Sequence, residues 1–165
     1  MALTRLRRSY PVMFALCLLG ALARAEPAAA FSFFINVQPL PICVPTKGGQ
    51  FCSLVIHANN GFPAIPAPLA VRLRVSVTPA FKAAVAVGAQ WACAINPAGT
   101  LVNCVYIGPK PIAPGFAFPS ITIRARAKPT ASPIFVPVCA TIQVFAGAVP
   151  QQFPGQTCTN VQIVP

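Results

Sequence analysis

The sequence predicts an all-β protein, an immunoglobulin-like antiparallel β-sandwich of about seven to nine strands, preceded by a cleavable signal-peptide helix. Two observations after residue 25 carry this prediction. Apolar and polar residues alternate with a period of two in segment after segment, which is strand periodicity. The connections are rich in proline and glycine, and 20 prolines in 165 residues are hostile to long helices. Strands with one buried and one wet face are typical of a two-sheet sandwich.

The first expected strand, residues 31–38, puts Phe31, Phe33 and Ile35 on one side. The second ends at the turn signal Asn59-Asn60-Gly61. The strand over 133–146 contains Pro137, which predicts a sheet edge or a bulge there. The full set of expected strands is 31–38, 50–58, 69–77, 83–95, 100–107, 120–128, 133–146 and 157–164.

Residues 1–25 predict a signal peptide. A basic start is followed by an apolar run over 12–23, which is too short to span a bilayer comfortably. Small residues then flank Arg24, so we expect cleavage between Ala25 and Glu26. Residues 26–36 form an N-terminal arm with the start of the first strand, and 37–165 form the immunoglobulin-like domain. We expect Sec rather than twin-arginine export to the periplasm or cell surface, and no transmembrane span in the mature chain.

The cysteines predict disulfides. Removing the signal leaves six of the seven, an even number in an exported chain. Six cysteines allow fifteen pairings, and the clustering favours short-range bridges. Asn96 to Gly99 reads as a turn that brings the flanking strands together, with Trp91 on the same side as one of the cysteines. The favoured pairs are Cys43 with Cys52, Cys93 with Cys104, and Cys139 with Cys158.

The charge balance is strongly basic, with a formal net charge of +11. Strands 69–77 and 120–128 carry basic residues on their polar sides. If these strands are neighbours, they form one cationic patch for lipopolysaccharide, acidic polysaccharide or nucleic acid. The alternative is ordinary solvation of exposed strand faces. We expect no specific nucleic-acid recognition, because aromatic residues are not interleaved with the basic ones. The candidate anion-binding residues are Arg72, Arg74, Arg124, Arg126 and Lys128.

The residue inventory argues against catalysis. From Glu26 onward the chain has one histidine, His57, one carboxylate side chain and no aspartate. A Ser-His-Asp triad, a pair of catalytic carboxylates or a carboxylate-bound metal cannot be assembled within it. The cysteine gaps are wider than those of structural zinc sites. We expect no catalytic residue, no cofactor and no metal site, and we expect His57 to be a partly exposed strand residue rather than a pH-sensitive contact or metal ligand.

Four patterns in order resemble a known family: "CVPTKGGQFCSLVIHANNG", "WACAINPAGTLVNCVY", "IAPGFAFPSITIRARA" and "VCATIQV". Together they resemble the immunoglobulin-like repeat of bacterial envelope and surface proteins called the domain of unknown function eleven, over roughly residues 37–165. The resemblance implies a non-catalytic spacer, adhesive stalk or display module. The chain departs from the family's Thr-Asp-x-Leu-Pro pattern at Val77-Thr78-Pro79-Ala80-Phe81, and it carries a single copy.

Three functions follow as hypotheses. The leading one is a non-catalytic exported module with a structural, adhesive or protein-binding role at the bacterial envelope. Its partner would be an envelope or surface protein, or an anionic polysaccharide. The second is a cationic binding module for envelope polyanions, whose affinity falls steeply with salt. The third is a pilin-like assembly subunit, whose first strand would complete a neighbouring sandwich.

Overall fold

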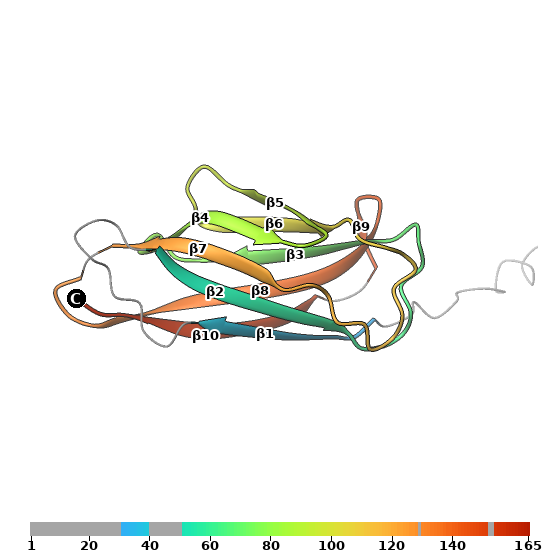
Figure 1. The fold of residues 1–165 in the computed structure, drawn as a ribbon, viewed down its shortest axis with the longest axis horizontal. Coiled ribbons are helices and arrows are strands. Elements are labelled where there is room, and N and C mark those ends of the chain that lie inside the picture. The colour runs from blue at the N-terminus through green and yellow to red at the C-terminus, as the bar shows by residue number, and fades with distance from the viewer. Residues whose placement is uncertain (1–30, 40–50, 129, 152–153) are drawn as a thin grey trace, which may run out of the picture.

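The computed structural model describes residues 31–39, 51–128, 130–151 and 154–165. In these segments the chain forms strands and no helix, which confirms the all-β prediction. The strands run along the long axis of the molecule (Figure 1). They are β1 (Phe33–Pro39), β2 (Phe51–Asn60), β3 (Ala70–Ser76), β4 (Phe81–Gly88), β5 (Trp91–Ile95), β6 (Leu101–Tyr106), β7 (Ile121–Ala127), β8 (Ile134–Ala146), β9 (Val149–Pro150) and β10 (Gly155–Ile163).

The strands form two antiparallel sheets packed face to face. The smaller sheet has the order β1-β2-β7-β4. The larger has the order β10-β8-β3-β6-β5, with β9 paired to the end of β8. Some neighbours are distant in sequence, as in the pairing of β2 with β7 and of β3 with β8, whereas β5 and β6 are consecutive strands. This is the predicted immunoglobulin-like sandwich, with ten strands in place of the expected seven to nine.

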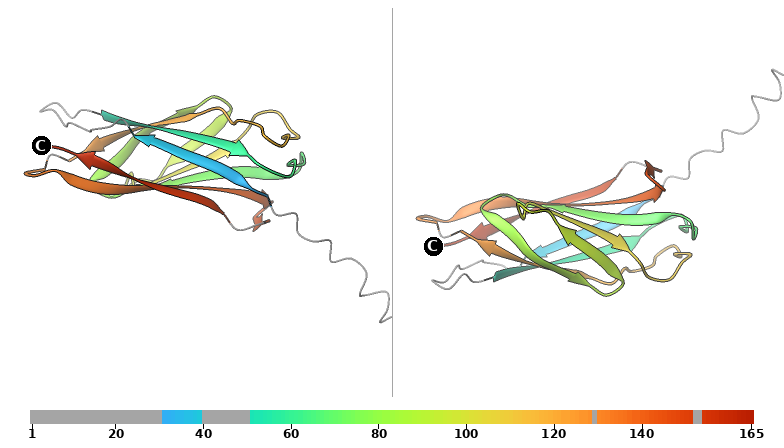
Figure 2. Two further views of the ribbon diagram at one scale, coloured as in Figure 1. Left: turned by 90° about the horizontal axis from the view of Figure 1, so that it is seen from below. Right: turned by 90° about the horizontal axis from the view of Figure 1, so that it is seen from above.

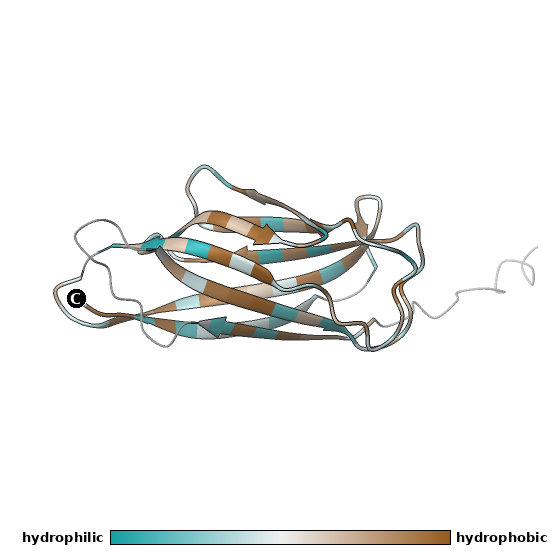
Figure 3. Cartoon of the chain, in the orientation of Figure 1, coloured by the Kyte–Doolittle hydropathy of each residue, from teal (hydrophilic) through white to brown (hydrophobic). Residues whose placement is uncertain are grey.

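Alternation along each strand places the core between the sheets. Figure 3 shows it as apolar and polar bands along the strands. On β3, the residues at 71, 73 and 75 are at most 1% exposed, whereas those at 72, 74 and 76 face outward. Each fully buried aliphatic side chain contributes about 1.5–3 kcal/mol relative to an exposed one. The largest buried aliphatic side chains are Leu54, Ile56, Ile65, Leu73, Ile112, Ile121, Ile123, Ile142 and Ile163.

The edges of the two sheets meet at both sides of the sandwich. β1 lies beside β10 and runs in the same direction (Figure 2). The approach is close at the start of both strands, where a Cβ on Gly155 would lie 3.3 Å from the Cβ of Phe33. At the other side β4 lies beside β5. The first strand is therefore part of its own sandwich and covers one edge of the core.

One predicted strand is two strands. The segment 83–95 was expected to be continuous, but the chain turns after Gly88 and resumes at Trp91. Gln90 has a φ of 60°, in the left-handed region, and its carbonyl accepts a hydrogen bond from the Ile107 amide at 2.8 Å. The turn carries the chain from the smaller sheet to the larger one. It lacks the Asn-Gly or Pro-Gly signature by which such turns are recognised, so the sequence prediction was wrong here.

The expected turn at residues 59–61 begins two residues late. β2 continues through Asn60, whose fully buried side chain donates to the carbonyls of Pro63 at 3.1 Å and Ala113 at 2.9 Å. These bonds hold two connections together at one end of the sandwich. Pro137 lies in β8, which is a central strand, yet the pairing of β8 with β3 ends at Cys139. Pro137 therefore has only β10 beside it, which is a local edge.

Several sequence predictions lie outside the described residues. These are the signal peptide over 1–25, its cleavage between Ala25 and Glu26, residues 26–30 of the arm 26–36, and Cys43. The described segments contain no helix that could span a membrane.

Candidate functional site

The outer face of the larger sheet carries an open groove of about 660 Å³. Its floor is built by three adjacent strands, with β3 in the middle, β6 on one side and β8 on the other. Pro154, directly before β10, adds a wall. We call this the sheet-face groove, and define it by its outward-facing lining residues Arg72, Arg74, Ser76, Asn103, Val105, Thr141, Gln143, Phe145 and Pro154.

Strand register arranges the lining in rows across the sheet. Arg74 stands directly opposite Asn103 of β6 and Thr141 of β8. The neighbouring row has Arg72 between Val105 and Gln143. Because side chains two apart on a strand share a face, the two arginines form a central column flanked by amide, hydroxyl and apolar groups.

Arg72 is held in place by two contacts. Its guanidinium lies 4.3 Å from the ring centroid of Phe145, a cation–π arrangement. One of its NH₂ groups donates to the Gly147 carbonyl at 3.1 Å. These contacts fix the position of the positive charge at one end of the groove.

Arg74 is not held in this way. Within the described segments neither Arg74, Asn103 nor Thr141 makes a side-chain hydrogen bond. Arg74 and Asn103 are exposed, and Thr141 is half-buried. The row therefore presents a guanidinium, an amide and a hydroxyl with unused hydrogen-bonding capacity on one surface.

The five candidate anion-binding residues do not form one patch. Arg72 and Arg74 lie on β3 of the larger sheet, whereas Arg124 and Arg126 lie on β7 of the smaller one. Both pairs face outward, so the two faces of the sandwich separate them. A single patch required β3 and β7 to be neighbours, and they are not. Lys128 follows β7, and its amide donates to the Ala80 carbonyl at 3.0 Å.

Sequence reasoning did not identify the residues that lie beside the arginines on neighbouring strands. Lys82 of β4 stands directly opposite Arg126, and Asn103 and Thr141 flank Arg74. Most of these pairings join segments 30 or more residues apart. Strand periodicity shows which face of the sheet a residue lies on, but not which residue lies beside it on the next strand. Only the strand order supplies that information.

Two disulfides match the predicted pairs. Cys93 is bonded to Cys104, and Cys139 to Cys158. Both join directly opposed residues of neighbouring antiparallel strands, with Cα–Cα separations of 4.0 and 4.1 Å. Cys52 is also disulfide-bonded, and its predicted partner Cys43 lies outside the described residues.

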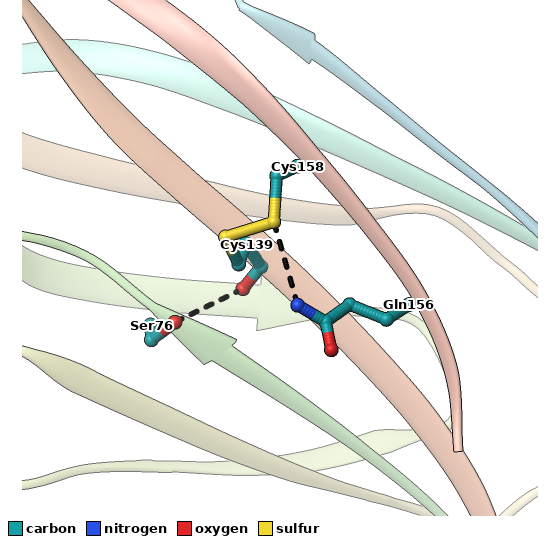
Figure 4. The surroundings of a disulfide bond; sticks show 4 residues. All are labelled: Ser76, Cys139, Gln156 and Cys158. Carbon is teal, nitrogen blue, oxygen red and sulfur yellow. Dashed lines mark hydrogen bonds between the residues drawn. A yellow bond between two sulfur atoms is a disulfide. The ribbon is translucent and has the colours of Figure 1, made fainter. Parts of the chain in front are cut away.

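The two bridges lie on different faces of the same sheet. Cys104 is fully buried, so the bridge from β5 to β6 belongs to the core. Cys158 is exposed and Cys139 half-buried, so the bridge from β8 to β10 lies on the outer face. There Ser76 donates to the Cys139 carbonyl and Gln156 to the Cys158 sulfur, each at 3.5 Å (Figure 4). This second bridge stands next to the sheet-face groove, at its Ser76 end.

Trp91 belongs to the core, on the same side of β5 as Cys93, as the alternation predicts. Its indole N–H donates to the Pro119 carbonyl at 2.8 Å. Its ring packs against Tyr106 and Phe118, with centroid separations of 5.3 and 5.6 Å. The tryptophan is therefore a packing residue with its one polar atom satisfied.

His57 faces outward from β2 and is exposed, opposite Asn36 of β1. Across the described segments, no group of three or more His, Cys, Asp or Glu side chains is placed to hold a metal ion. The whole sequence has a single acidic residue, Glu26, which lies outside those segments. The described surface therefore offers cations, amides and hydroxyls, and no side-chain carboxylate.

Neither a protein-family model nor a curated protein sequence matches the chain. Solved structures do resemble it. A non-cellulosomal cohesin from the hyperthermophilic archaeon Archaeoglobus fulgidus is 10% identical, with 79% of this chain and 91% of that one covered and a TM-score of 0.50. A cohesin module from a Clostridium perfringens family 33 glycoside hydrolase is 8% identical, covering 82% and 98%, with a TM-score of 0.51.

The major pilin subunit of Bacillus cereus is 12% identical, with 81% of this chain and 40% of the pilin covered and a TM-score of 0.52. The chain thus corresponds to about two fifths of that pilin. At these identities the similarity shows the fold: the chain has the immunoglobulin-like sandwich found in cohesin and pilin domains.

Proposed function

We propose that the protein is an exported, non-catalytic immunoglobulin-like module that binds a protein partner at the bacterial envelope through the sheet-face groove. The groove carries the proposal. It is the outer face of a rigid, disulfide-bonded sheet, and it presents charged, polar and apolar groups on strands rather than on loops. Such a surface suits recognition of a partner, since the backbone that carries the side chains is already fixed before binding and Arg72 is held in place.

The chemistry of the chain supports a non-catalytic role. One histidine, one glutamate and no aspartate can form neither a Ser-His-Asp triad nor a pair of catalytic carboxylates. The three solved structures compared above are described as two cohesin modules and a pilin subunit. Protein binding and assembly at a surface are therefore the roles that we assign.

Export is supported by the disulfides. Three cysteine pairs were expected, two pairs are joined in the structure and Cys52 is bonded as well. Disulfides persist in oxidising compartments such as the periplasm and cell surface. Together with the signal peptide expected over residues 1–25, they favour a location outside the cytoplasm. Membership of the domain of unknown function eleven, expected from four sequence patterns, is likewise our proposal, and the sandwich fold is what supports it.

The polyanion hypothesis loses its main support because the basic residues are divided between two opposite faces. The pilin-like hypothesis requires the first strand to leave its own sandwich. In the structure β1 pairs with β2 over residues 33–39 and contributes Val37, 6% exposed, to the core. A partner-binding face therefore explains the surface better than strand donation does.

A matched pair of variants tests the groove. Ser76→Trp adds a bulky side chain to the groove floor, and Ser53→Trp adds the same side chain to the outer face of the smaller sheet. Each chain, purified after export, is incubated with native envelope, chemically crosslinked and analysed by mass spectrometry. We expect one or more partner proteins to crosslink to the wild type and to Ser53→Trp, and to be lost with Ser76→Trp. Equal crosslinking by both variants would refute the groove as the binding face.

A further inference from the structure

We propose that the occupant of the sheet-face groove is an extended protein segment with acidic residues at alternate positions, bound by Arg72 and Arg74. This inference rests on the proposed function, and it adds the chemistry of the partner. It follows from the spacing of the two arginines, from the unused hydrogen-bonding groups beside Arg74, and from the apolar surface beside Arg72.

The spacing fits an extended polypeptide. Outward side chains two residues apart on a strand are separated by about 6.6 Å. Alternate side chains of an extended partner segment have the same separation. A segment lying along β3 would therefore place two carboxylates, in the pattern acidic-x-acidic, opposite Arg72 and Arg74 at once.

The row at Arg74 can receive a whole carboxylate. A guanidinium offers a planar fork of donors that matches the two carboxylate oxygens, and each oxygen accepts more than one hydrogen bond. Asn103 and Thr141, directly opposite Arg74 on either side, offer an amide and a hydroxyl donor on the same face. Together these three residues can satisfy the oxygens of one Asp or Glu side chain.

Arg72 provides a second, already positioned charge. Its contacts with Phe145 and the Gly147 carbonyl restrict the guanidinium before a partner arrives, which lowers the entropy lost on binding. No side-chain carboxylate in the described segments neutralises either arginine. The partner is therefore the source of the negative charge.

The groove is less suited to an acidic polysaccharide. Sugar rings pack their C–H faces on exposed aromatic rings, and the aromatic side chain lining the groove, Phe145, has one face covered by Arg72. Val105, 37% exposed, and Pro154 add aliphatic surface, which suits the aliphatic carbons of amino-acid side chains. A polyanion would also gain from pooled charge, whereas the basic residues are divided between two faces.

Fluorescence anisotropy with synthetic peptides tests the proposal. The probe is a labelled peptide of alternating Glu and Ser; a second peptide has the same composition with its Glu residues in one block, and a third has Gln in place of Glu. Three variants are compared: Arg74→Gln, which removes no internal hydrogen bond, Arg72→Gln/Arg74→Gln, and the control Arg124→Gln/Arg126→Gln. The control removes the same charge from the same spacing on the other sheet. Thermal melts establish that each variant is folded.

We expect the alternating peptide to bind more tightly than the blocked peptide, and the Gln peptide not to bind. The groove pair should weaken binding by about a hundredfold and Arg74→Gln alone by about tenfold, the loss expected for charged hydrogen bonds. The control pair should change it less than about twofold. Equal losses of peptide affinity in the groove double variant and the control double variant would show that the peptide responds only to net charge. This result would overturn the proposal. Equal binding of the alternating and blocked peptides would overturn it as well.

Polygalacturonate serves as an acidic polysaccharide competitor. If it binds with the same sensitivity to the groove pair while the alternating peptide does not bind, the inference is overturned in favour of a glycan. The Ser76→Trp crosslinking experiment distinguishes failure of the proposed groove function from failure of the acidic-segment proposal. Loss of partner crosslinking in that variant, combined with no peptide binding, would leave the groove function standing and refute the acidic segment alone.

Discussion

Tyr106 shows how burial controls a single side chain. It is 2% exposed at the end of β6, and its hydroxyl donates to the Gln90 side-chain oxygen at 3.0 Å. Burial disfavours the charged phenolate, and it raises the pKa of Tyr106 above its ordinary value of 10.0. The neutral form is the one that fits both the aromatic packing and the hydrogen bond.

The raised pKa predicts a loss of stability at high pH. Because the folded-state pKa exceeds the unfolded one, Tyr106 stabilises the fold fully below about pH 10, and this stabilisation is lost as the pH rises through the folded pKa. The predicted mature chain has no other tyrosine. Absorbance of tyrosinate therefore follows this one group. We expect the folded protein to titrate at higher pH than the protein in denaturant.

Tyr106→Phe provides the control. It should remove the Tyr106 contribution to the loss of stability at high pH, and it should lower the free energy of unfolding by about 1 kcal/mol through loss of the hydroxyl bond. A folded protein whose tyrosine titrates no later than the denatured one would contradict the assignment.

Disulfides belong to the scale of the strand pair. Each closes a short loop, with sequence separations of 11 and 19 residues, and each should contribute about 3 kcal/mol in the chain-entropy model. Accessibility separates them, since Cys158 is exposed whereas Cys104 is fully buried. We predict that a mild reductant at neutral pH opens the Cys139–Cys158 bridge of the folded protein well before the Cys93–Cys104 bridge.

Alkylation of newly formed thiols followed by mass spectrometry gives the order of opening. The same experiment in denaturant is the control, because both bridges are then exposed and should open at similar rates. Simultaneous opening in the folded protein would show that the sheet opens as one unit. Cys139→Ser/Cys158→Ser should fold and lose about 3 kcal/mol of unfolding free energy.

Strand periodicity was informative wherever one face of a strand is buried. The segments 69–77 and 120–128 alternate cleanly, and β3 and β7 lie within them. The cysteines at 93 and 104 could be paired because the turn between them is encoded locally: the Asn96 side chain accepts from the amides of Thr100 and Leu101 at 2.8 and 2.9 Å. The break at Gln90 has no such local code, so two strands were read as one.

The site was beyond the reach of periodicity for a physical reason. Which residues share a face depends on one strand, whereas which residues stand beside Arg74 depends on the pairing of β3 with β6 and β8. Those pairings are set by the packing of the whole sandwich. Sequence alone therefore identified the outward arginines and left open whether Arg124 is their neighbour; in the structure it lies in the other sheet.

At the scale of the molecule, β1 closes one edge of the sandwich, and its removal tests strand donation. Phe33 and Ile35 pack against the core beside buried Val37. We predict that deleting residues 26–38 lowers the free energy of unfolding by on the order of 5 kcal/mol, through lost apolar burial and exposure of the β2 edge. Thermal melts and size-exclusion chromatography measure the effect.

Deleting residues 26–30 is the matched control, since it ends before Phe31, and it should leave the melting temperature unchanged. If the longer deletion instead folds normally and recovers a strand from an added peptide of residues 31–39, the pilin-like hypothesis would replace ours.

The bond between Cys139 and Cys158 also governs what happens when the molecule is pulled. The C-terminal end of β10 lies at one extremity of the long axis (Figure 1). Tension applied there would peel β10 away from β8, one pair after another, from Ile163 back to Thr159. The next pair is the covalent one, and peeling stops there. The rows at Thr141 and Gln143 lie on the far side of that anchor, so the groove would keep its shape while the end of the chain is under load.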